Sequence, residues 1–177
     1  MNMTENKKVV VTGGAGFVGS HFVESCLGEG VQPDVLVHLA AIHYIPECEA
    51  KPSRAIRMNI EGTQNVLSAC VDSVSRVVFA STGAIYDPSV ADPLTEVSAI
   101  KTGDVYGITK LACEELVSYH AKKKRGNVVI ARLFNAVGTR ETNPHLIPEI
   151  AVQLANGSRE IELGNLYPKR DAGNKLN

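Results

Sequence analysis

The hydrophobic positions of this 177-residue chain fall into short apolar runs that alternate with longer stretches of helical periodicity. The short runs are rich in valine and are bounded by glycine, proline or polar residues, as is typical of buried β-strands. We expect strands at Lys7–Thr12, Val35–Leu39, Arg76–Ala80 and Asn127–Leu133. The stretches between them predict helices over Phe17–Leu27, Pro52–Ser73 and Val105–Lys124.

Strands separated by helices predict βαβ units, so the expected fold class is α/β, with a doubly wound parallel sheet of the Rossmann type and helices on both faces. Beyond the fourth strand the pattern indicates a loop over Asn135–Thr142, a short helix over Pro144–Asn156 and a strand at Ile161–Leu163. We therefore expect residues 1–134 to form the main domain and residues 135–177 to begin a smaller lobe.

The composition excludes several classes of function. A net charge of −1 gives no basic surface for nucleic acid, and the cluster Lys122–Arg125 is explained by the solvated last turn of a helix. No apolar run is long enough to cross a membrane, and the N-terminus lacks the apolar segment of a signal peptide. The four cysteines and five histidines show no metal-ligand spacing. We expect a cytoplasmic protein with reduced thiols and without a metal, membrane or nucleic-acid partner.

Gly13, Gly16 and Gly19 follow the first predicted strand directly and open the first predicted helix. Glycines in such a turn let the backbone approach phosphate oxygens, and the helix N-terminus adds amide donors and partial positive charge. The turn therefore favours binding of a dinucleotide diphosphate. The acidic residue that usually holds the ribose is not found, because a count of about 20 residues reaches Leu39 inside an apolar strand and Asp34 begins that strand.

Tyr106 and Lys110 are four residues apart in a predicted helix and therefore share one face. A neighbouring ammonium, together with a positive nicotinamide ring, lowers the pKa of a phenol and favours its use as a base. Thr82 follows a buried strand at the carboxyl edge, where doubly wound folds have their sites, and its hydroxyl could share the proton. The alternatives are a packed tyrosine, a solvated lysine and a threonine that only caps the next turn.

Seven short motifs are distributed over nearly the whole chain. They are, in chain order, Thr12-Gly13-Gly14-Ala15-Gly16-Phe17-Val18-Gly19, His38-Leu39-Ala40-Ala41, Asn59-Ile60-Glu61-Gly62-Thr63, Ser81-Thr82-Gly83-Ala84-Ile85-Tyr86, Tyr106-Gly107-Ile108-Thr109-Lys110, Arg132-Leu133-Phe134-Asn135 and Arg170-Asp171. Together, and in this order, they resemble the NAD-dependent epimerase/dehydratase family of the extended short-chain dehydrogenase/reductase superfamily.

The resemblance implies an NAD cofactor, a nucleotide-diphosphate sugar as substrate, and a homodimer formed by the helices that carry Asn59–Cys70 and Tyr106–Tyr119. Residues 1–134 would then be the NAD-binding domain, and residues 135–177 an incomplete substrate-binding lobe. The implied catalytic residues are Tyr106, Lys110 and Thr82. The implied cofactor-binding residues are Gly13, Gly16, Phe17, Val18, Gly19, Leu39, Ala40, Ala41, Asn59, Tyr106, Lys110 and Leu133. The implied substrate-binding residues are Thr82, Asn135 and Arg170.

Gly83 and Ala84 separate the reaction types within this family. The 4,6-dehydratases that the chain resembles typically have Asp and Glu at these positions, and these carboxyl groups serve as acid and base for elimination of water. Glycine and alanine cannot do this, so the resemblance favours a 4-epimerase, in which hydride leaves C4 of the sugar and returns to its other face. The alternatives are a nucleotide-sugar oxidoreductase or reductase, and a non-catalytic remnant that binds nucleotide.

The chain departs from the family pattern at two places. On the order of 40 residues, which form the second and third strands in relatives, are absent between about residues 28 and 34. A direct link over the face of the first helix would need a left-handed crossover, which is rare. This predicts that residues are omitted or genuinely deleted there. Relatives also continue from Arg170-Asp171 into a strand and a complete lobe, whereas this chain stops at Asn177.

Overall fold

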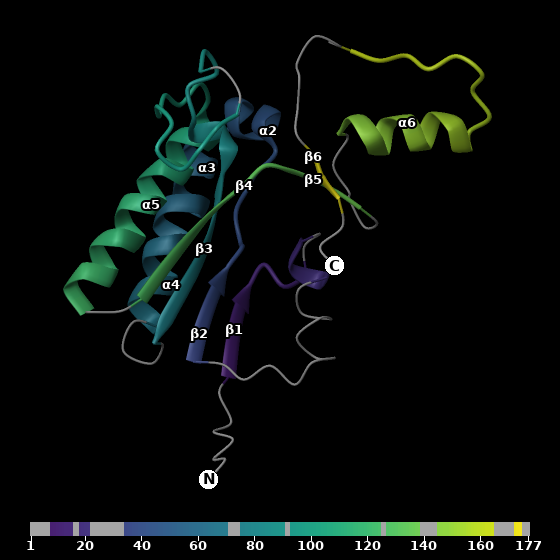
Figure 1. Ribbon diagram of the computed structural model, residues 1–177. Coiled ribbons are helices and arrows are strands. Elements are labelled where there is room, and N and C mark those ends of the chain that lie inside the picture. The colour runs from purple at the N-terminus through teal and green to yellow at the C-terminus, as the bar shows by residue number, and fades with distance from the viewer. Residues whose placement is uncertain are drawn as a thin grey trace. The chain divides into compact units, whose positions relative to one another are not determined.

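The computed structural model forms two compact units, Met1–Leu133 and Phe134–Asn177, each of which is considered by itself (Figure 1). No helix among the described residues is long and apolar enough to cross a membrane. The residues that the structure describes are 8–15, 18–21, 34–70, 75–90, 93–124, 127–138, 145–164 and 172–174.

A four-stranded parallel sheet forms the centre of the first unit. Its order is β1-β2-β3-β4, with β1 at Lys8–Thr12, β2 at Asp34–His38, β3 at Arg76–Thr82 and β4 at Asn127–Leu133. The valine-rich runs therefore form the expected strands, although β3 is two residues longer than predicted. Because all four strands are parallel, their carboxyl ends meet at one edge of the sheet, where Thr82 is the register partner of Leu133.

Helices from two connections pack on one face of this sheet (Figure 1). The predicted helix over Pro52–Ser73 is divided into α3, a π-helical turn η1 and α4, whereas α5 has its predicted bounds. The sequence pattern did not predict the short α2. The bounds are Ile45–Ala50 for α2, Pro52–Ile56 for α3, Arg57–Glu61 for η1, Gly62–Cys70 for α4 and Val105–Lys124 for α5.

The core lies between the sheet and the helices α4 and α5. Phe79 of β3 is fully buried and is surrounded by aliphatic side chains, so the apolar face of each element is covered by the other. Cys48 and Cys113 are buried free thiols, as expected for reduced cysteines. The buried members of the core are Leu36, Leu67, Val77, Phe79, Cys113 and Val117.

The described residues of the second unit form one helix and a two-stranded parallel sheet. Helix α6 spans Leu146–Ala155, and Gly157 follows it with φ +81°, which agrees with the predicted helix stop. Two predictions were wrong here. The expected loop contains strand β5 at Asn135–Val137, which pairs with β6 at Ala172–Asn174. Ile161–Leu163 is not a strand, because its three residues have no strand partner among the described residues.

The predicted first helix is described only at residues 18–21, which are helical, and Gly28 lies outside the described residues. β1 pairs directly with β2, as the first and fourth strands do in the doubly wound order. The connection between them includes residues 22–33, outside the described residues, so the crossover and the gap stay predictions.

Candidate active site

The turn after β1 requires glycine at two positions. Gly13 has φ +76°, and a Cβ there would lie 2.8 Å from the amide nitrogen of Ala40. A Cβ on Gly19 would lie 2.1 Å from the carbonyl oxygen of Gly13. The first turn of the helix and the segment after β2 therefore approach the glycine backbone more closely than any side chain permits. Val18 lies in the helical turn, whereas Gly16 and Phe17 lie outside the described residues.

The segment Leu39–Ala41 is attached to the end of β1. The amide of Leu39 donates to the carbonyl oxygen of Thr12 at 3.1 Å, and the amide of Ala40 donates to the Thr12 hydroxyl at 3.4 Å. The glycine turn and the predicted cofactor-binding segment are thus adjacent along the carboxyl edge of the sheet. This arrangement fits a dinucleotide, because both parts present backbone and small side chains to the same place.

His38 connects these strands to α4, a role that the sequence did not reveal. Its Nδ1 lies 2.5 Å from the Thr12 hydroxyl and its Nε2 lies 2.9 Å from the Thr63 hydroxyl. Burial, assisted by the charge of Lys110, lowers the pKa of His38 to about 4. The imidazole is therefore neutral at physiological pH and acts as a hydrogen-bonded tie between β1 and α4.

Thr82 ends β3 and begins the 3₁₀ turn η2 at Gly83–Ile85. Its hydroxyl accepts a hydrogen bond from the amide of Ala84 at 3.2 Å, so the capping role considered above is present. Tyr106 lies in the first turn of α5, and the neighbouring Thr82 hydroxyl acts to lower the pKa of its phenol. The capping role of Thr82 is thus present, and its role in proton transfer stays a prediction.

The start of α5 is fixed by two carboxylates. Asp104 accepts from the amide of Gly107 at 2.7 Å, and Glu49 of α2 accepts from the amide of Val105 at 2.7 Å. These acceptors satisfy amides that have no partner within the helix. A Cβ on Gly107 would lie 2.9 Å from the carbonyl oxygen of Ala84, so glycine permits α5 to approach η2 closely. The first turn of α5 is therefore held rigidly beside Thr82.

Tyr106 has a raised pKa. Burial raises it to about 12, and the Thr82 hydroxyl opposes this shift only in part. Removal of the phenol from water disfavours its anion, and Cys48 and Asp104 add to this effect. The protein's own groups therefore keep the phenol protonated at neutral pH. The predicted lowering by Lys110 together with a positive nicotinamide ring concerns the protein with NAD bound and stays a prediction.

Lys110 is almost completely enclosed, with 2% of its surface exposed. Burial lowers the pKa of Lys110 to about 8, and its Nζ lies 4.3 Å from the centroid of the Phe79 ring. The alternative of a solvated lysine is thus wrong. An ammonium over a buried aromatic ring is partly stabilised, and it still titrates far more readily than a surface lysine.

Asn59 lies in the π-helical turn and is 1% exposed. Its amide group exchanges hydrogen bonds with Ile42, at 2.8 Å from the Ile42 amide and 2.9 Å to the Ile42 carbonyl. The same Nδ2 donates to the Thr109 hydroxyl at 2.9 Å, which donates to the carbonyl oxygen of Tyr106 at 2.8 Å. Asn59 therefore links the segment after β2 to the backbone of the tyrosine, and its predicted contact with the cofactor stays a prediction.

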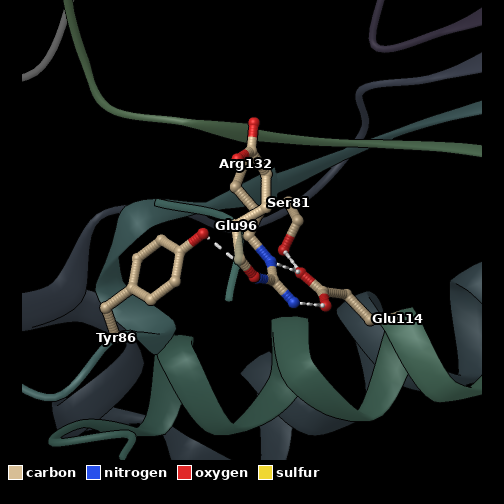
Figure 2. Close-up of polar contacts among 5 residues, drawn as sticks. All are labelled: Ser81, Tyr86, Glu96, Glu114 and Arg132. Atoms are coloured by element: carbon tan, nitrogen blue, oxygen red, sulfur yellow. Dashed lines mark hydrogen bonds and ion pairs between the residues drawn. The ribbon is translucent and has the colours of Figure 1, made fainter. Parts of the chain in front are cut away.

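A second buried charge lies one turn beyond Lys110 (Figure 2). Glu114 receives two hydrogen bonds from Arg132 of β4, at 3.0 Å from Nε and 2.9 Å from Nη2, and a third from the Ser81 hydroxyl. Nη1 of Arg132 donates to the Tyr86 hydroxyl and to the carbonyl oxygen of Glu96, each at 3.0 Å. The bond to Glu114 raises the pKa of Arg132. The sequence analysis missed this group of five residues.

The remaining predicted site residues are distributed between the two units. Leu133 ends β4 beside Thr82 in the register of the first unit. Asn135 begins β5 in the second unit, and Arg170 lies outside the described residues. The structure thus places Tyr106 and Lys110 one turn apart at the start of α5, near Thr82 at the end of β3. The substrate-binding roles of Asn135 and Arg170 stay predictions.

The profile of the "NAD dependent epimerase/dehydratase family" matches residues 27–174 of this chain. The chain belongs to this family. Its cofactor is accordingly NAD. The parallel sheet with flanking helices is the Rossmann-type fold expected from the sequence.

Known family members that resemble this chain differ in activity. The chain is 29% identical to the GDP-6-deoxy-D-talose 4-dehydrogenase of Aggregatibacter actinomycetemcomitans, over 93% of this chain and 65% of that protein. It is 28% identical to the UDP-glucose 4-epimerase of Halalkalibacterium halodurans, over 86% and 60%. A solved UDP-N-acetylglucosamine 4-epimerase from Methanobrevibacter ruminantium M1, in complex with UDP-N-acetylmuramic acid, superposes with a TM-score of 0.85 at 25% identity. This match covers 97% of this chain and 70% of that one.

The chain spans about 60 to 65% of the length of the two curated relatives. The alignment with the dehydrogenase extends over 195 positions although it includes 93% of a 177-residue chain, so roughly 30 positions of the relative have no counterpart here. This number is smaller than the roughly 40 residues predicted to be absent, and it does not show where the gaps lie. The predicted deletion near residues 28–34 stays a prediction.

Proposed function

We propose that this protein acts as an NAD-dependent nucleotide-sugar 4-epimerase. The observation that carries the proposal is the placement of Thr82, which is buried at the carboxyl end of β3, near Tyr106 and the buried Lys110 in the first turns of α5. The glycine turn lies along the same edge, since β1 and β3 are parallel members of one sheet. A base for a sugar hydroxyl and a cradle for a dinucleotide thus occur in one unit.

In the proposed site, Gly13, Gly19 and Leu39–Ala41 hold the cofactor, and Lys110 bonds its nicotinamide ribose. NAD, when bound, accepts a hydride from C4 of the sugar and can return it to the other face of the keto-sugar. Lys110 is 2% exposed, so its ammonium is largely shielded from water in this site.

Tyr106 takes the proton of the C4 hydroxyl in this proposal, and Thr82 shares that proton through its hydrogen bond. With a pKa of about 12 in the protein alone, the phenol needs added positive charge nearby to serve as a base at neutral pH. The Lys110 ammonium supplies part of that charge, because its pKa of about 8 keeps it mostly protonated at pH 7. The tyrosine is therefore inert until the site is filled, which limits proton transfer to the bound state.

The η2 turn supports epimerisation over dehydration. Gly83 and Ala84 occupy the two positions at which 4,6-dehydratases of the family carry an acid and a base, and neither residue can move a proton. Elimination of water from C5 and C6 thus lacks its catalytic groups, whereas removal and return of a hydride at C4 needs only Tyr106 and the cofactor.

A 4-dehydrogenase or reductase is the second candidate, and the 29% identity to a GDP-6-deoxy-D-talose 4-dehydrogenase favours it. The two reactions use the same tyrosine and lysine but differ in the fate of the hydride. An epimerase returns it to the sugar, so no free NADH accumulates. A dehydrogenase releases its keto-sugar and leaves one NADH for each turnover.

The test uses the full chain with NAD and, in separate reactions, UDP-glucose, UDP-N-acetylglucosamine or a GDP-6-deoxyhexose that carries deuterium at C4. The proposal expects the C4 epimer with its deuterium retained and no rise in NADH absorbance. NADH equal to the sugar consumed would establish the dehydrogenase instead. Absence of NAD binding, or binding without conversion of any sugar, would leave the non-catalytic remnant as the function.

We further propose that Asn135 and Arg170 hold the diphosphate of the substrate and that the protein is a homodimer. The dimer is supported by exposed apolar side chains on the helices that relatives use for association, among them Met58 of η1 and Ile108 of α5. Sedimentation equilibrium tests it, with a double Met58→Glu and Ile108→Glu variant expected to be monomeric. A monomeric parent protein would contradict this part of the proposal.

A further inference from the structure

The Arg132–Glu114 ion pair is attached to both ends of the segment that carries Thr82 (Figure 2). Ser81 precedes Thr82, and its hydroxyl donates a hydrogen bond to Oε1 of Glu114. Tyr86 closes the η2 turn and accepts from Nη1 of Arg132 at 3.0 Å. One ion pair therefore brackets the segment from Ser81 to Tyr86.

The ion pair is itself held rigidly. Nε and Nη2 of Arg132 contact the two oxygens of Glu114 at 3.0 and 2.9 Å, so the guanidinium and carboxylate form a bidentate pair. The side chain of Glu114 is 6% exposed and that of Arg132 is 20% exposed. The Arg132 guanidinium carbon also lies 5.1 Å from the centroid of the Tyr86 ring. A paired and largely enclosed carboxylate keeps one geometry, which a surface ion pair does not.

The attachment at Ser81 controls where the Thr82 side chain points. Consecutive side chains in a strand project to opposite faces, so a strand that is fixed with Ser81 against α5 also has the rotation of Thr82 fixed. On the other side of Thr82, Gly107 admits the Ala84 carbonyl, which would lie 2.9 Å from a Cβ at that position. α5 thus contacts the segment on both sides of Thr82, at Glu114 and at Gly107, and Tyr106 lies on the same helix.

We infer that Glu114, held by Arg132, is a positioning residue that directs the Thr82 hydroxyl to Tyr106 by way of Ser81. The inference rests on the proposed function for its catalytic consequence. Glu114 touches neither substrate nor cofactor in this role. The effect of Glu114 passes through the Ser81 hydroxyl. Removal of that hydroxyl should therefore change the environment of the Tyr106 phenol only when residue 82 has a hydroxyl that can bond the phenol.

The test is a double-mutant cycle of Ser81→Ala and Thr82→Val in the full chain, with two readouts. The first is the ¹³Cζ resonance of Tyr106 in tyrosine-labelled protein, assigned with Tyr106→Phe, which reports the hydrogen bond without any need for activity. The second is kcat for C4 epimerisation. Each single variant is expected to move the Tyr106 resonance in the same direction, and Ser81→Ala is expected to lower kcat about tenfold with KM unchanged. In the Thr82→Val background, Ser81→Ala should change neither quantity further.

Two controls separate positioning from loss of stability. Leu67→Ala removes a core side chain of α4, and it should lower the melting temperature without moving the Tyr106 resonance. Tyr86→Phe removes the other attachment of the segment and should move the resonance in the same direction as Ser81→Ala, by less. Full retention of the wild-type Tyr106 resonance in Ser81→Ala, or equal effects of Ser81→Ala with and without Thr82, would overturn the inference.

The two readouts also separate this inference from the proposed function. A coupled shift of the Tyr106 resonance in a chain that converts no sugar would sustain the positioning role and reject the epimerase. A chain that epimerises the sugar, and whose Tyr106 resonance does not change in Ser81→Ala, would sustain the epimerase and reject the positioning role.

Discussion

Lys110 and Glu114 lie one helical turn apart on the same side of α5, and their surfaces are 2% and 5% exposed. Glu114 is matched by a bidentate arginine and a serine hydroxyl. Lys110 lies over the ring of Phe79, and burial lowers its pKa to about 8. The carboxylate is buried with its charge compensated, and the ammonium is buried at a cost. This difference indicates that the turn of α5 with Glu114 stabilises the fold. The turn with Lys110 instead has the shifted pKa that is typical of functional sites.

The largest effect is expected at Tyr106, in the first turn of α5. Tyr106→Phe should lower kcat about 1,000-fold, because it removes the proposed general base and leaves the ring in place. Its free energy of unfolding should change by no more than about 1 kcal/mol, since only one hydroxyl is lost. Steady-state kinetics and urea denaturation measure the two quantities. Tyr119→Phe, on the exposed part of α5, is the control and should be indistinguishable from wild type, and near-normal turnover of Tyr106→Phe would refute the assignment.

The next largest effect is expected at Glu114, the buried carboxylate that is paired with Arg132. Glu114→Ala should lower the free energy of unfolding by about 3 kcal/mol, because it leaves the guanidinium of Arg132 without its carboxylate in a largely enclosed position. Urea denaturation at pH 7 measures this, with the exposed neighbour Glu115→Ala expected to change stability by less than about 0.5 kcal/mol. Equal effects of the two variants would mean that Glu114 is an ordinary surface charge.

Removal of the charge of Lys110 is expected to raise the free energy of unfolding, whereas removal of the charge of Glu114 lowers it. The folded pKa of about 8 lies below the usual value of 10.5, so the unfolded chain binds more protons between these values and stability rises with pH across that window. At pH 7 the full cost of the buried ammonium is present. Lys110→Met should therefore raise the free energy of unfolding by about 2 kcal/mol at pH 7, after allowance for the lost ring contact, and abolish turnover.

The gain from Lys110→Met should shrink as the pH rises from 8 to 10.5, because the folded lysine is then already neutral and the unfolded lysine gradually loses its proton as well. Denaturant midpoints at pH 7 and pH 10 provide the comparison. Lys122→Met, at the exposed end of α5, is the matched control. A destabilised Lys110→Met protein would show that the ammonium is as well compensated as Glu114.

The smallest expected effect tests the approach of α5 to η2. A glycine-to-alanine change within a helix normally stabilises it by about 1 kcal/mol. At Gly107 the new Cβ would lie 2.9 Å from the Ala84 carbonyl oxygen, so we expect a net loss of about 1 kcal/mol. Gly62→Ala in α4, where no atom lies within 4 Å of the added Cβ, should show the normal gain. Thermal denaturation of both variants measures the difference, and a stabilised Gly107→Ala protein would show that η2 can move away.

The strands and α5 could be predicted from the sequence because their signals are local. A valine run such as Val9–Val11 or the periodic stretch Val105–Lys124 indicates its own structure. Long-range pairing cannot be recognised in this way. Asn135–Val137 becomes a strand only because Ala172–Asn174 lies beside it, and Ile161–Leu163 has a strand-like composition without such a partner.

The same distinction applies to the candidate site. Thr82, Tyr106 and Lys110 were found by spacing and by family resemblance, whereas the partnership of Glu114 with Arg132 joins a helix to a strand 18 residues away. A signal for it was present, since Glu114 continues the four-residue spacing of Tyr106 and Lys110 along one helical face. The pKa of Tyr106 could not be predicted from spacing, because it depends on burial.

The π-helical turn Arg57–Glu61 gives the chain one residue more than an uninterrupted α-helix would need between Pro52 and Cys70. That surplus residue sets the rotation at which Asn59 meets both Ile42 and Thr109. Deleting a single residue such as Met58 would let the helix close into regular geometry and would turn the following side chains by about 100° relative to the preceding ones. The helix would then be more regular, and the asparagine would face away from both the segment after β2 and the tyrosine. Length, as well as residue identity, is therefore under constraint in this part of the protein.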